Sequence, residues 1–273
     1  MTNQTQLIDR HALLGHRGRH VPGRGDFLHD EAIIDVQDRL SMFTKSFTDV
    51  AIVTSFPDPW ARAFPDACVV ADDDVLDLAE QSFDLVIHGM CLHWANDPVG
   101  QLIQCRRALR PDGLFIAVLI GGETLSELRA SLAEAEIKVR GGLSPRVLPM
   151  PEIRDVGGLL QRAAFALPVA DSAVIKTEYA NLFSLMADLR AMGETNALTE
   201  RSRHFTPRAV FVEAAQIYTE TFGTESGAIP ARFEQIFLTG WAPDESQPKP
   251  LKPGSASMRL ADALGVPEKP LKD

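Results

Sequence analysis

Two histidines, a cysteine and a tryptophan crowd one short stretch of the sequence. His88, Cys91, His93 and Trp94 follow the mostly apolar run Phe83-Asp-Leu-Val-Ile87. Such a run is typical of a buried strand in a parallel sheet, and open α/β sheets bind their ligands at the carboxyl ends of these strands. The four side chains therefore mark a candidate ligand site.

The same stretch has a superficial metal-binding pattern, because His88, Cys91 and His93 are of types that bind zinc. Zinc needs further ligands in tetrahedral geometry, and no paired cysteine or carboxylate motif supplies them nearby. Cys91 also has no base beside it in the sequence that would activate a thiolate. We predict no metal ion and no nucleophilic role for Cys91. For the histidines, ordinary packing and hydrogen bonding compete with a ligand-binding role.

Three consecutive carboxylates form a second candidate group. Asp72, Asp73 and Asp74 directly follow Cys68-Val-Val-Ala71, another short apolar run with the character of a strand. Either Asp72 contacts a ligand at the end of this strand, or the run is a solvated turn that ends the element.

The elements that must position these groups follow from the hydrophobic pattern. Strands are expected at 50–54, 68–71, 83–87 and 114–120, and an amphipathic helix at 97–109 followed by a turn at 110–113 makes a βαβ unit. The expected fold class is α/β, a mostly parallel sheet flanked by helices. The pattern also predicts helices at 29–45 (with Asp26 as N-cap), 124–139, 153–164, 182–192 and 207–222, and late strands at 174–179 and 233–241.

Length and composition indicate an ordinary globular protein of 273 residues, 45% of them hydrophobic. We divide it into an N-terminal arm (1–28), a main α/β domain (29–242) with a helical insertion at about 181–222, and an extended C-terminal tail (243–273). The stretch 10–24 holds four Arg and three His. It reads as a solvated arm, with docking to an acidic partner as the alternative.

Charge and cysteine content restrict the partners and the compartment. The formal net charge is −10, which argues against nucleic acid as the main partner. Three cysteines are too few for a disulfide scaffold and favour a reducing compartment. No apolar run approaches the roughly 20 residues of a transmembrane helix. We expect a soluble, cytoplasmic protein.

From Asp72 onward the sequence resembles a known family. The segments 72–78, 82–86, 92–97 and 109–115 are similar to consecutive signatures of class I S-adenosylmethionine (SAM)-dependent methyltransferases. The segments 121–125, 141–145, 192–196 and 240–247 resemble motifs of one branch, which includes a mitochondrial complex I assembly factor (an arginine hydroxylase) and is close to the malonyl-carrier-protein methyltransferase of biotin synthesis. The resemblance implies a Rossmann-like class I methyltransferase fold and covers roughly residues 68–265.

The resemblance also implies roles for particular residues. Near the SAM cofactor it places two residues at the end of the first strand, two of the acidic run and three from the histidine-rich stretch: Thr54, Ser55, Asp72, Asp73, His88, His93 and Trp94. Near a substrate it places two glycines after the strand 114–120 and three residues of the branch-specific motifs: Gly121, Gly122, Glu194, Asn196 and Trp241.

The first half of this fold looks shortened. Family members end their first strand in a glycine-rich loop, since the backbone must turn sharply and approach the cofactor without a Cβ in the way. Here the strand continues as Thr54-Ser-Phe-Pro-Asp-Pro-Trp60, and no glycine occurs between Gly25 and Gly89. The interval between the strands at Val50 and Phe83 has room for little more than one βαβ step, and the usual ribose-binding acid has no obvious counterpart. We predict weak or absent SAM binding.

Three functions remain open on the sequence. The first is a SAM-dependent protein-modifying enzyme or an assembly factor acting on a respiratory complex I subunit, as the resemblance implies. The second is a non-catalytic scaffold or chaperone that has lost SAM binding. The third is a small-molecule or carrier-protein methyltransferase, which the branch-specific motifs disfavour. The sequence leaves enzymatic activity itself undecided.

Overall fold

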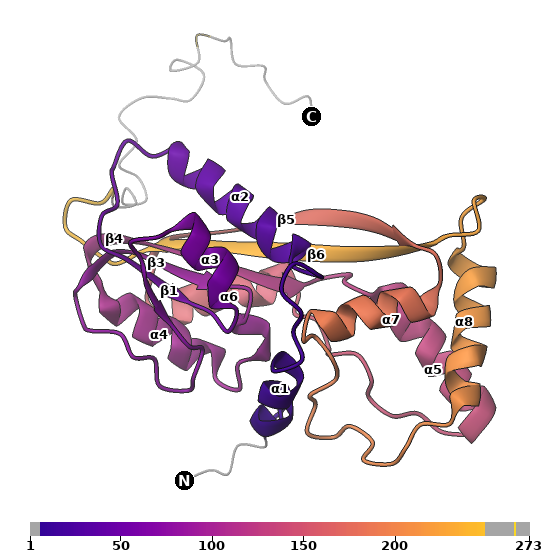
Figure 1. Cartoon of the computed structure of the whole chain (residues 1–273). Helices are drawn as coiled ribbons and strands as arrows, with labels where there is room; N and C mark the ends of the chain where they lie inside the picture. Colours follow the sequence, from indigo (N-terminus) through magenta and orange to yellow (C-terminus); the bar gives the residue numbers. More distant parts are fainter. Residues whose placement is uncertain (1–5, 249–264, 266–273) are drawn as a thin grey trace, which may run out of the picture. The chain divides into compact units, whose positions relative to one another are not determined.

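A six-stranded mixed sheet with helices packed against it carries the fold (Figure 1). The structure is a computed structural model that describes residues 6–248 and 265. Its strands are β1 (Val50–Val53), β2 (Cys68–Val70), β3 (Phe83–Gly89), β4 (Leu109–Gly121), β5 (Ala166–Tyr179) and β6 (Ile229–Trp241). Its helices are α1 (Arg10–Arg17), α2 (Phe27–Ser41), α3 (Pro57–Ala63), α4 (Pro98–Ala108), α5 (Ser126–Arg140), α6 (Ile153–Arg162), α7 (Leu182–Ala191) and α8 (Arg208–Phe222), with a 3-10 turn η1 (Leu92–Trp94).

The strand order is β2-β1-β3-β4-β6-β5. The pairs β1–β2, β1–β3 and β3–β4 are parallel, whereas β6 runs antiparallel to both β4 and β5. This arrangement confirms the predicted α/β fold with its mostly parallel sheet flanked by helices. The parallel half brings the carboxyl ends of β1, β2 and β3 to one edge, where the candidate cofactor residues follow.

Strand β4 shows why the central strands read as continuous apolar runs. Ile116 and Val118 face the larger core, beneath α2, α5, α7 and α8, while Phe115 and Ala117 face a second core beneath α4 and α6. All four are completely buried. A strand covered on both faces has no solvent side, so the alternation of polar residues disappears.

The first half of the sheet is short, as the sequence predicts. Residues 54–67 connect β1 to β2 and contain one helix, the seven-residue α3. Strand β2 pairs directly with β1, in the register Val53↔Val70. In this fully described part of the chain, no further strand lies between Val53 and Cys68.

Two expected elements differ from those observed. Residues 110–113 belong to β4 as an irregular stretch with Asp112 at φ 57°, where a separate turn was expected. Strand β5 begins at Ala166, eight residues earlier than predicted, because it pairs with β6 along its length. Its side chains are half-buried or exposed, so a search for buried apolar runs misses its first half.

The N-terminal stretch is not a solvated arm. Leu13 is fully buried and Arg17 is 7% exposed, so α1 is packed into the fold. Asp26 does precede α2, but its carboxylate accepts hydrogen bonds from His20 and from the Gly23 N–H and caps no helix. Most of the predicted extended tail lies outside the described residues. Across residues 6–248, no helix is both long and apolar enough to cross a membrane.

Truncating the buried Ile116 side chain of β4 tests whether this strand lies in the sheet interior. Ile116→Ala is expected to lower the free energy of unfolding by roughly 2–5 kcal/mol, from lost burial and the cavity left behind. Val75→Ala is the control, because Val75 is 80% exposed, and we expect a change within about 0.5 kcal/mol. Urea titration followed by circular dichroism measures both. Equal effects would contradict the assignment of Ile116 to the core.

Candidate functional site

Most of the predicted cofactor residues meet at one edge of the sheet. Thr54 and Ser55 follow β1, Asp72 follows β2, and His88 belongs to the last residues of β3. The Thr54 N–H donates to the Val70 carbonyl at 2.9 Å, which holds the two strand ends together. Sheets of this kind receive a ligand at this edge. We call the region between these strand ends the cleft, although in this chain buried side chains fill it.

A buried carboxylate occupies the centre of this cleft. The side chain of Asp72 is 2% exposed, and its oxygens accept hydrogen bonds from Arg17 Nη1 at 3.0 Å, from Arg10 Nη2 at 3.0 Å and from the Ser55 hydroxyl. Burial by itself would raise the pKa of Asp72. The hydrogen bonds and positive charges of the two arginines, with the Ser55 hydroxyl, outweigh burial and lower this pKa to about 2. Asp72 is therefore ionised and fully engaged by its own chain.

Arg17 reaches the cleft from the last turn of α1. Its side chain is 5% exposed, and Nη1 donates to both Ser55 and Asp72, so that one guanidinium bridges the ends of β1 and β2. Nε and Nη2 are buried and have no hydrogen-bond partner among the described residues. The Arg17 guanidinium also lies 5.8 Å from the centre of the Phe56 ring.

Aromatic side chains of the segment after β1 pack against the end of β3 and against α2. Trp60 of α3 is fully buried against Gly89 at the end of β3, and a Cβ on Gly89 would lie 2.6 Å from the indole. Trp60 Nε1 donates to His29 Nδ1 at 3.1 Å, and the His29 ring lies 5.0 Å from that of Phe56. Burial lowers the pKa of His29 to about 4 and keeps it neutral.

His88 and Cys91 are buried beside the Asp72 region and make contacts within the chain there. The His88 ring is fully buried and 3.0 Å from Gln101 Oε1, while Gln101 Nε2 donates to the carbonyls of Asp72 and Asp73. Burial raises the pKa of the Cys91 thiol, which lies 3.7 Å from His88 Nδ1. These two side chains hold the strand ends in place. Within the described residues, no group of three His, Cys, Asp or Glu is placed to hold a metal ion.

His93, Trp94 and Glu194 form a separate polar group. The Ile120 N–H lies 3.5 Å from His93 Nδ1, so Nε2 is left to donate to Glu194 Oε2, also at 3.5 Å. Trp94 Nε1 donates to the same oxygen, and among the described residues no hydrogen bond reaches Oε1. Burial alone would raise the pKa of Glu194. The hydrogen bond from His93, the positive charge of Arg17 and the Trp94 N–H lower this pKa, so the carboxylate is ionised.

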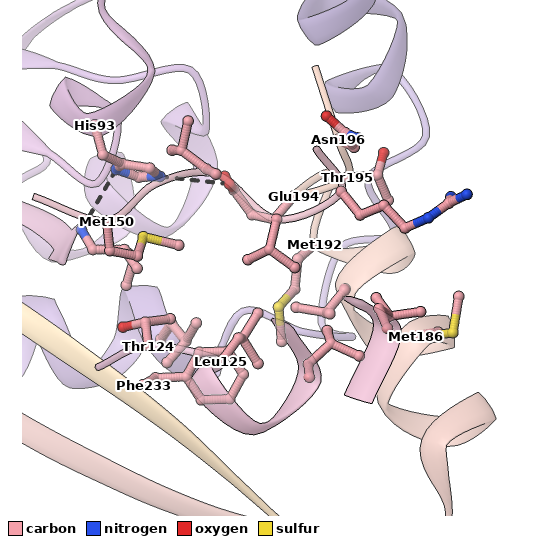
Figure 2. Close-up of a pocket in the computed structure, with 18 of the residues that line it drawn as sticks. His93, Thr124, Leu125, Met150, Met186, Met192, Glu194, Thr195, Asn196 and Phe233 are labelled. Atoms are coloured by element: carbon pink, nitrogen blue, oxygen red, sulfur yellow. Dashed lines mark hydrogen bonds and ion pairs between the residues drawn. The ribbon is translucent and has the colours of Figure 1, made fainter. Parts of the chain in front are cut away.

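This polar group lines one wall of a mostly apolar pocket of about 270 Å³, whose other polar lining residues are Thr124, Arg146, Thr195 and Asn196. Arg146 pairs with Glu136 at 2.6 Å. Figure 2 shows the dashed contact between His93 and Glu194 above the thioethers of Met150 and Met192. Asn196 also lines the pocket, with its amide donating to the Pro145 carbonyl at 2.8 Å. The other lining residues come from α2, β4, α5, α7, α8, β6 and the loops between them: Leu28, Ile120, Thr124, Leu125, Leu128, Leu132, Arg146, Val147, Leu148, Met186, Leu189, Thr195, Phe211 and Phe233.

Known proteins with a methyltransferase domain are similar to this chain in sequence and in fold. A methyltransferase-domain family model matches residues 45–117. A solved structure from Bacillus halodurans, described as a candidate methyltransferase, aligns with TM-score 0.50 and 14% identity over 78% of this chain and 99% of that one. The chain has the fold of class I methyltransferases, and its residues 45–117 are similar to the methyltransferase domain.

Two groups of relatives are similar to this chain over about two thirds or more of its length. The mitochondrial arginine-hydroxylase NDUFAF5 of Danio rerio is 41% identical over 198 residues, which is 72% of this chain and 61% of the relative; the human protein is 39% identical over 72% and 57%. A malonyl-[acyl-carrier protein] O-methyltransferase of Xylella fastidiosa is 36% identical over 66% of this chain and 58% of that protein. The matched region spans between 45% and 61% of the NDUFAF5 relatives' own length.

Several residues expected near a ligand of this methyltransferase fold lie elsewhere or serve packing. Gly121 and Gly122 lie beside the pocket without lining it; a Cβ on Gly122, at φ +55°, would meet the Glu234 carboxylate at 2.1 Å. Trp241 lies at the far end of β6, opposite Leu114, and packs against Phe43. The structure therefore does not bring Trp241 to the pocket.

The two remaining cofactor candidates have modest contacts. Thr54 is buried, and its hydroxyl accepts a hydrogen bond from the Phe56 N–H at 3.2 Å, which stabilises the turn after β1. The Asp73 side chain is 66% exposed and accepts from Arg10 at 3.2 Å.

Sequence reasoning missed Arg17, Arg10 and Trp60, which fill the cleft. The available signal was the spacing of Leu13 and Arg17, four residues apart and therefore on one face of a helix. Because the stretch is rich in Arg and His, it was interpreted as solvated and its buried helix face was not predicted. The methionines of the pocket carried no sequence signal, because Met150 precedes α6 whereas Met186 and Met192 lie in α7 and at its end.

A double-mutant cycle tests the buried ion pair. Arg17→Met is expected to lower the free energy of unfolding by roughly 3 kcal/mol, because it removes one of the two cations paired with the buried Asp72 carboxylate. Adding Asp72→Asn should recover at least half of this loss, since the uncompensated charge disappears. Arg62→Met, at an exposed arginine of α3, is the control. Additive effects of the two site substitutions in denaturant titrations would contradict direct pairing.

Proposed function

We propose that this methyltransferase-family protein works by binding a segment of a partner protein, as an assembly factor of the respiratory complex I type, and does not hold SAM in its cleft. The bridging of Ser55 and Asp72 by Arg17 carries the proposal. A nucleoside in this cleft would have to displace a guanidinium that neutralises a buried carboxylate. Displacement would leave Asp72 with Arg10 as its one remaining cation, at a cost of several kcal/mol.

The segment after β1 adds a second obstacle. A class I site gains affinity from backbone N–H groups in the turn after the first strand, but Pro57 and Pro59 have none, and their φ angles are fixed. This segment also carries Phe56 and Trp60, which pack beside His29 and against Gly89, where the resemblance implies glycines. The cleft is thus filled both by α1 and by α3.

The pocket supports partner binding. An ionised Glu194 with a free Oε1, set among methionine and leucine side chains, suits a cation on an apolar stem. An arginine or lysine side chain has this chemistry, and the names of the NDUFAF5 relatives specify arginine. We therefore propose that the pocket receives an arginine side chain of the partner.

A SAM-dependent protein-modifying enzyme is the second candidate. It is favoured by the position of His93 and Trp94, which follow β3 in the way the family's cofactor residues do and also line the pocket. A carrier-protein methyltransferase has less support, because the malonyl-[acyl-carrier protein] relatives are less similar than the NDUFAF5 relatives.

The proposed compartment is the cytoplasm, although the names of the NDUFAF5 relatives specify mitochondria. Cys91 and Cys105 are buried free thiols and Cys68 is an exposed one, which suits a reducing compartment.

Calorimetric titration with SAM tests the cofactor part of the proposal. The resemblance implies three polar contacts to SAM: backbone N–H groups after the first strand, a ribose-binding carboxylate and an adenine contact at Asp72. The first two have no counterpart here, and Asp72 is occupied by Arg17 and Arg10. Each contact is worth one to a few kcal/mol, so a micromolar site should weaken to the millimolar range. A class I methyltransferase of known SAM affinity, titrated in the same buffer, is the control. A dissociation constant in the low micromolar range would overturn the proposal and favour the enzyme.

Binding of N-acetylargininamide, followed by NMR, tests the pocket. Glu194→Gln is expected to weaken binding about tenfold or more, because a hydrogen bond to a charged group contributes about 1.5–3 kcal/mol. Glu200→Gln is the matched control at an exposed position and should leave binding unchanged. Equal affinities of the wild type and Glu194→Gln would show that this carboxylate does not recognise the guanidinium.

A further inference from the structure

Helix α1 contacts both the filled cleft and the partner pocket. At its carboxyl end Arg17 enters the cleft, while His16 Nδ1 lies 3.2 Å from the carbonyl of Thr195, a residue that lines the pocket. The backbone at Arg17 packs against Gly193, where an added Cβ would lie 3.0 Å from the Arg17 Cα. The end of α1 therefore holds the segment that carries Glu194.

The amino end of α1 contacts the same wall. Ile8 and Leu13 are fully buried in a small apolar cluster with Trp94, Leu148 and Leu198. The Asp9 N–H donates to the Ala197 carbonyl at 2.8 Å, and the Asp9 carboxylate pairs with Arg201 at 2.9 Å. Segment 193–198 is thus fixed to α1 at both of its ends.

The cleft supplies the anchor for α1. The Asp72 carboxylate follows β2 in the rigid part of the sheet, and Arg17 and Arg10 tie the last and first turns of α1 to it. Gly193 adopts φ +76°, a conformation that favours glycine and lets the segment follow the surface of α1 closely. A shift of Arg17 would move its backbone, and the Gly193–Thr195 contacts would move with it.

We infer that Arg17 is a positioning residue for the partner pocket: by bridging Ser55 and Asp72, it does in this chain the ordering work that a bound ligand would do in an open cleft. The guanidinium fixes α1, α1 fixes segment 193–198, and that segment presents Glu194 to the pocket. The inference rests on the proposed function for the nature of the pocket's ligand, but not for the ordering of the segment itself.

Two readouts test the inference on the full chain. Hydrogen–deuterium exchange of the backbone amides of residues 193–198 reports their order without any ligand, and NMR titration with N-acetylargininamide reports the pocket. Arg17→Met is expected to raise exchange in this segment and to weaken binding at least tenfold. Arg17→Lys keeps the charge with one compact donor and should recover part of both. Arg62→Met should change neither.

The variant Arg17→Met/Asp72→Asn separates positioning from stability. It removes the uncompensated charge, so it should regain stability while segment 193–198 still exchanges fast and binding remains weak. If Arg17→Met alone does not fold, the double variant is used in its place to measure exchange and binding. Slow exchange in the double variant would overturn the inference. If the wild type binds no N-acetylargininamide, the proposed ligand is wrong, and the exchange measurements still decide the role of Arg17.

Discussion

The pairing of Asp72 with Arg17 and Arg10 is the interaction on which the site depends. A carboxylate with 2% exposure must be neutralised, since an unpaired buried charge costs far more than one ion pair stabilises. The pairing draws α1 into the cleft, and α1 then packs against Trp94 and segment 193–198. A single electrostatic requirement thus closes the cleft and builds one wall of the pocket.

The shortened sheet explains why this pairing is possible. Because β2 pairs directly with β1, Asp72 lies within hydrogen-bond distance of Ser55, and one guanidinium can reach both. A strand inserted between them would move Asp72 about 4.8 Å away from β1 and would leave room for a ligand between the strand ends. The direct pairing of β2 with β1 and the filling of the cleft by Arg17 are therefore linked by geometry.

The sequence was sufficient to predict the central strands of the sheet, but not the side chains that fill the cleft at its edge. Buried strands such as β4 carry a strong local signal, because both faces demand apolar side chains, and the missing glycines after Val53 correctly indicated a reduced first half. The partner of Asp72 could not be found in this way, since Arg17 is 55 residues distant and its surroundings look like a solvated basic stretch. Trp241 illustrates the opposite error: its motif resembles the family's, but the length of β6 carries it away from the pocket. Long-range pairing and strand length are tertiary properties, which local patterns do not contain.

The pocket and the filled cleft are separate spaces, although α1 and the residues after β3 contact both. Glu194 keeps its charge through His93 and Trp94, whose positions are fixed by the end of β3 and by the Ile120 N–H. None of these contacts requires a bound nucleoside. In the proposed function, residues facing the pocket recognise a cationic side chain without a ligand in the cleft, provided that some group holds α1 in place.

Arg17 is such a group. It neutralises the Asp72 carboxylate and adds to the positive potential that keeps Glu194 ionised. On this proposal, an internal guanidinium maintains both the order and the charge balance of the site, and recognition in this fold needs no cofactor.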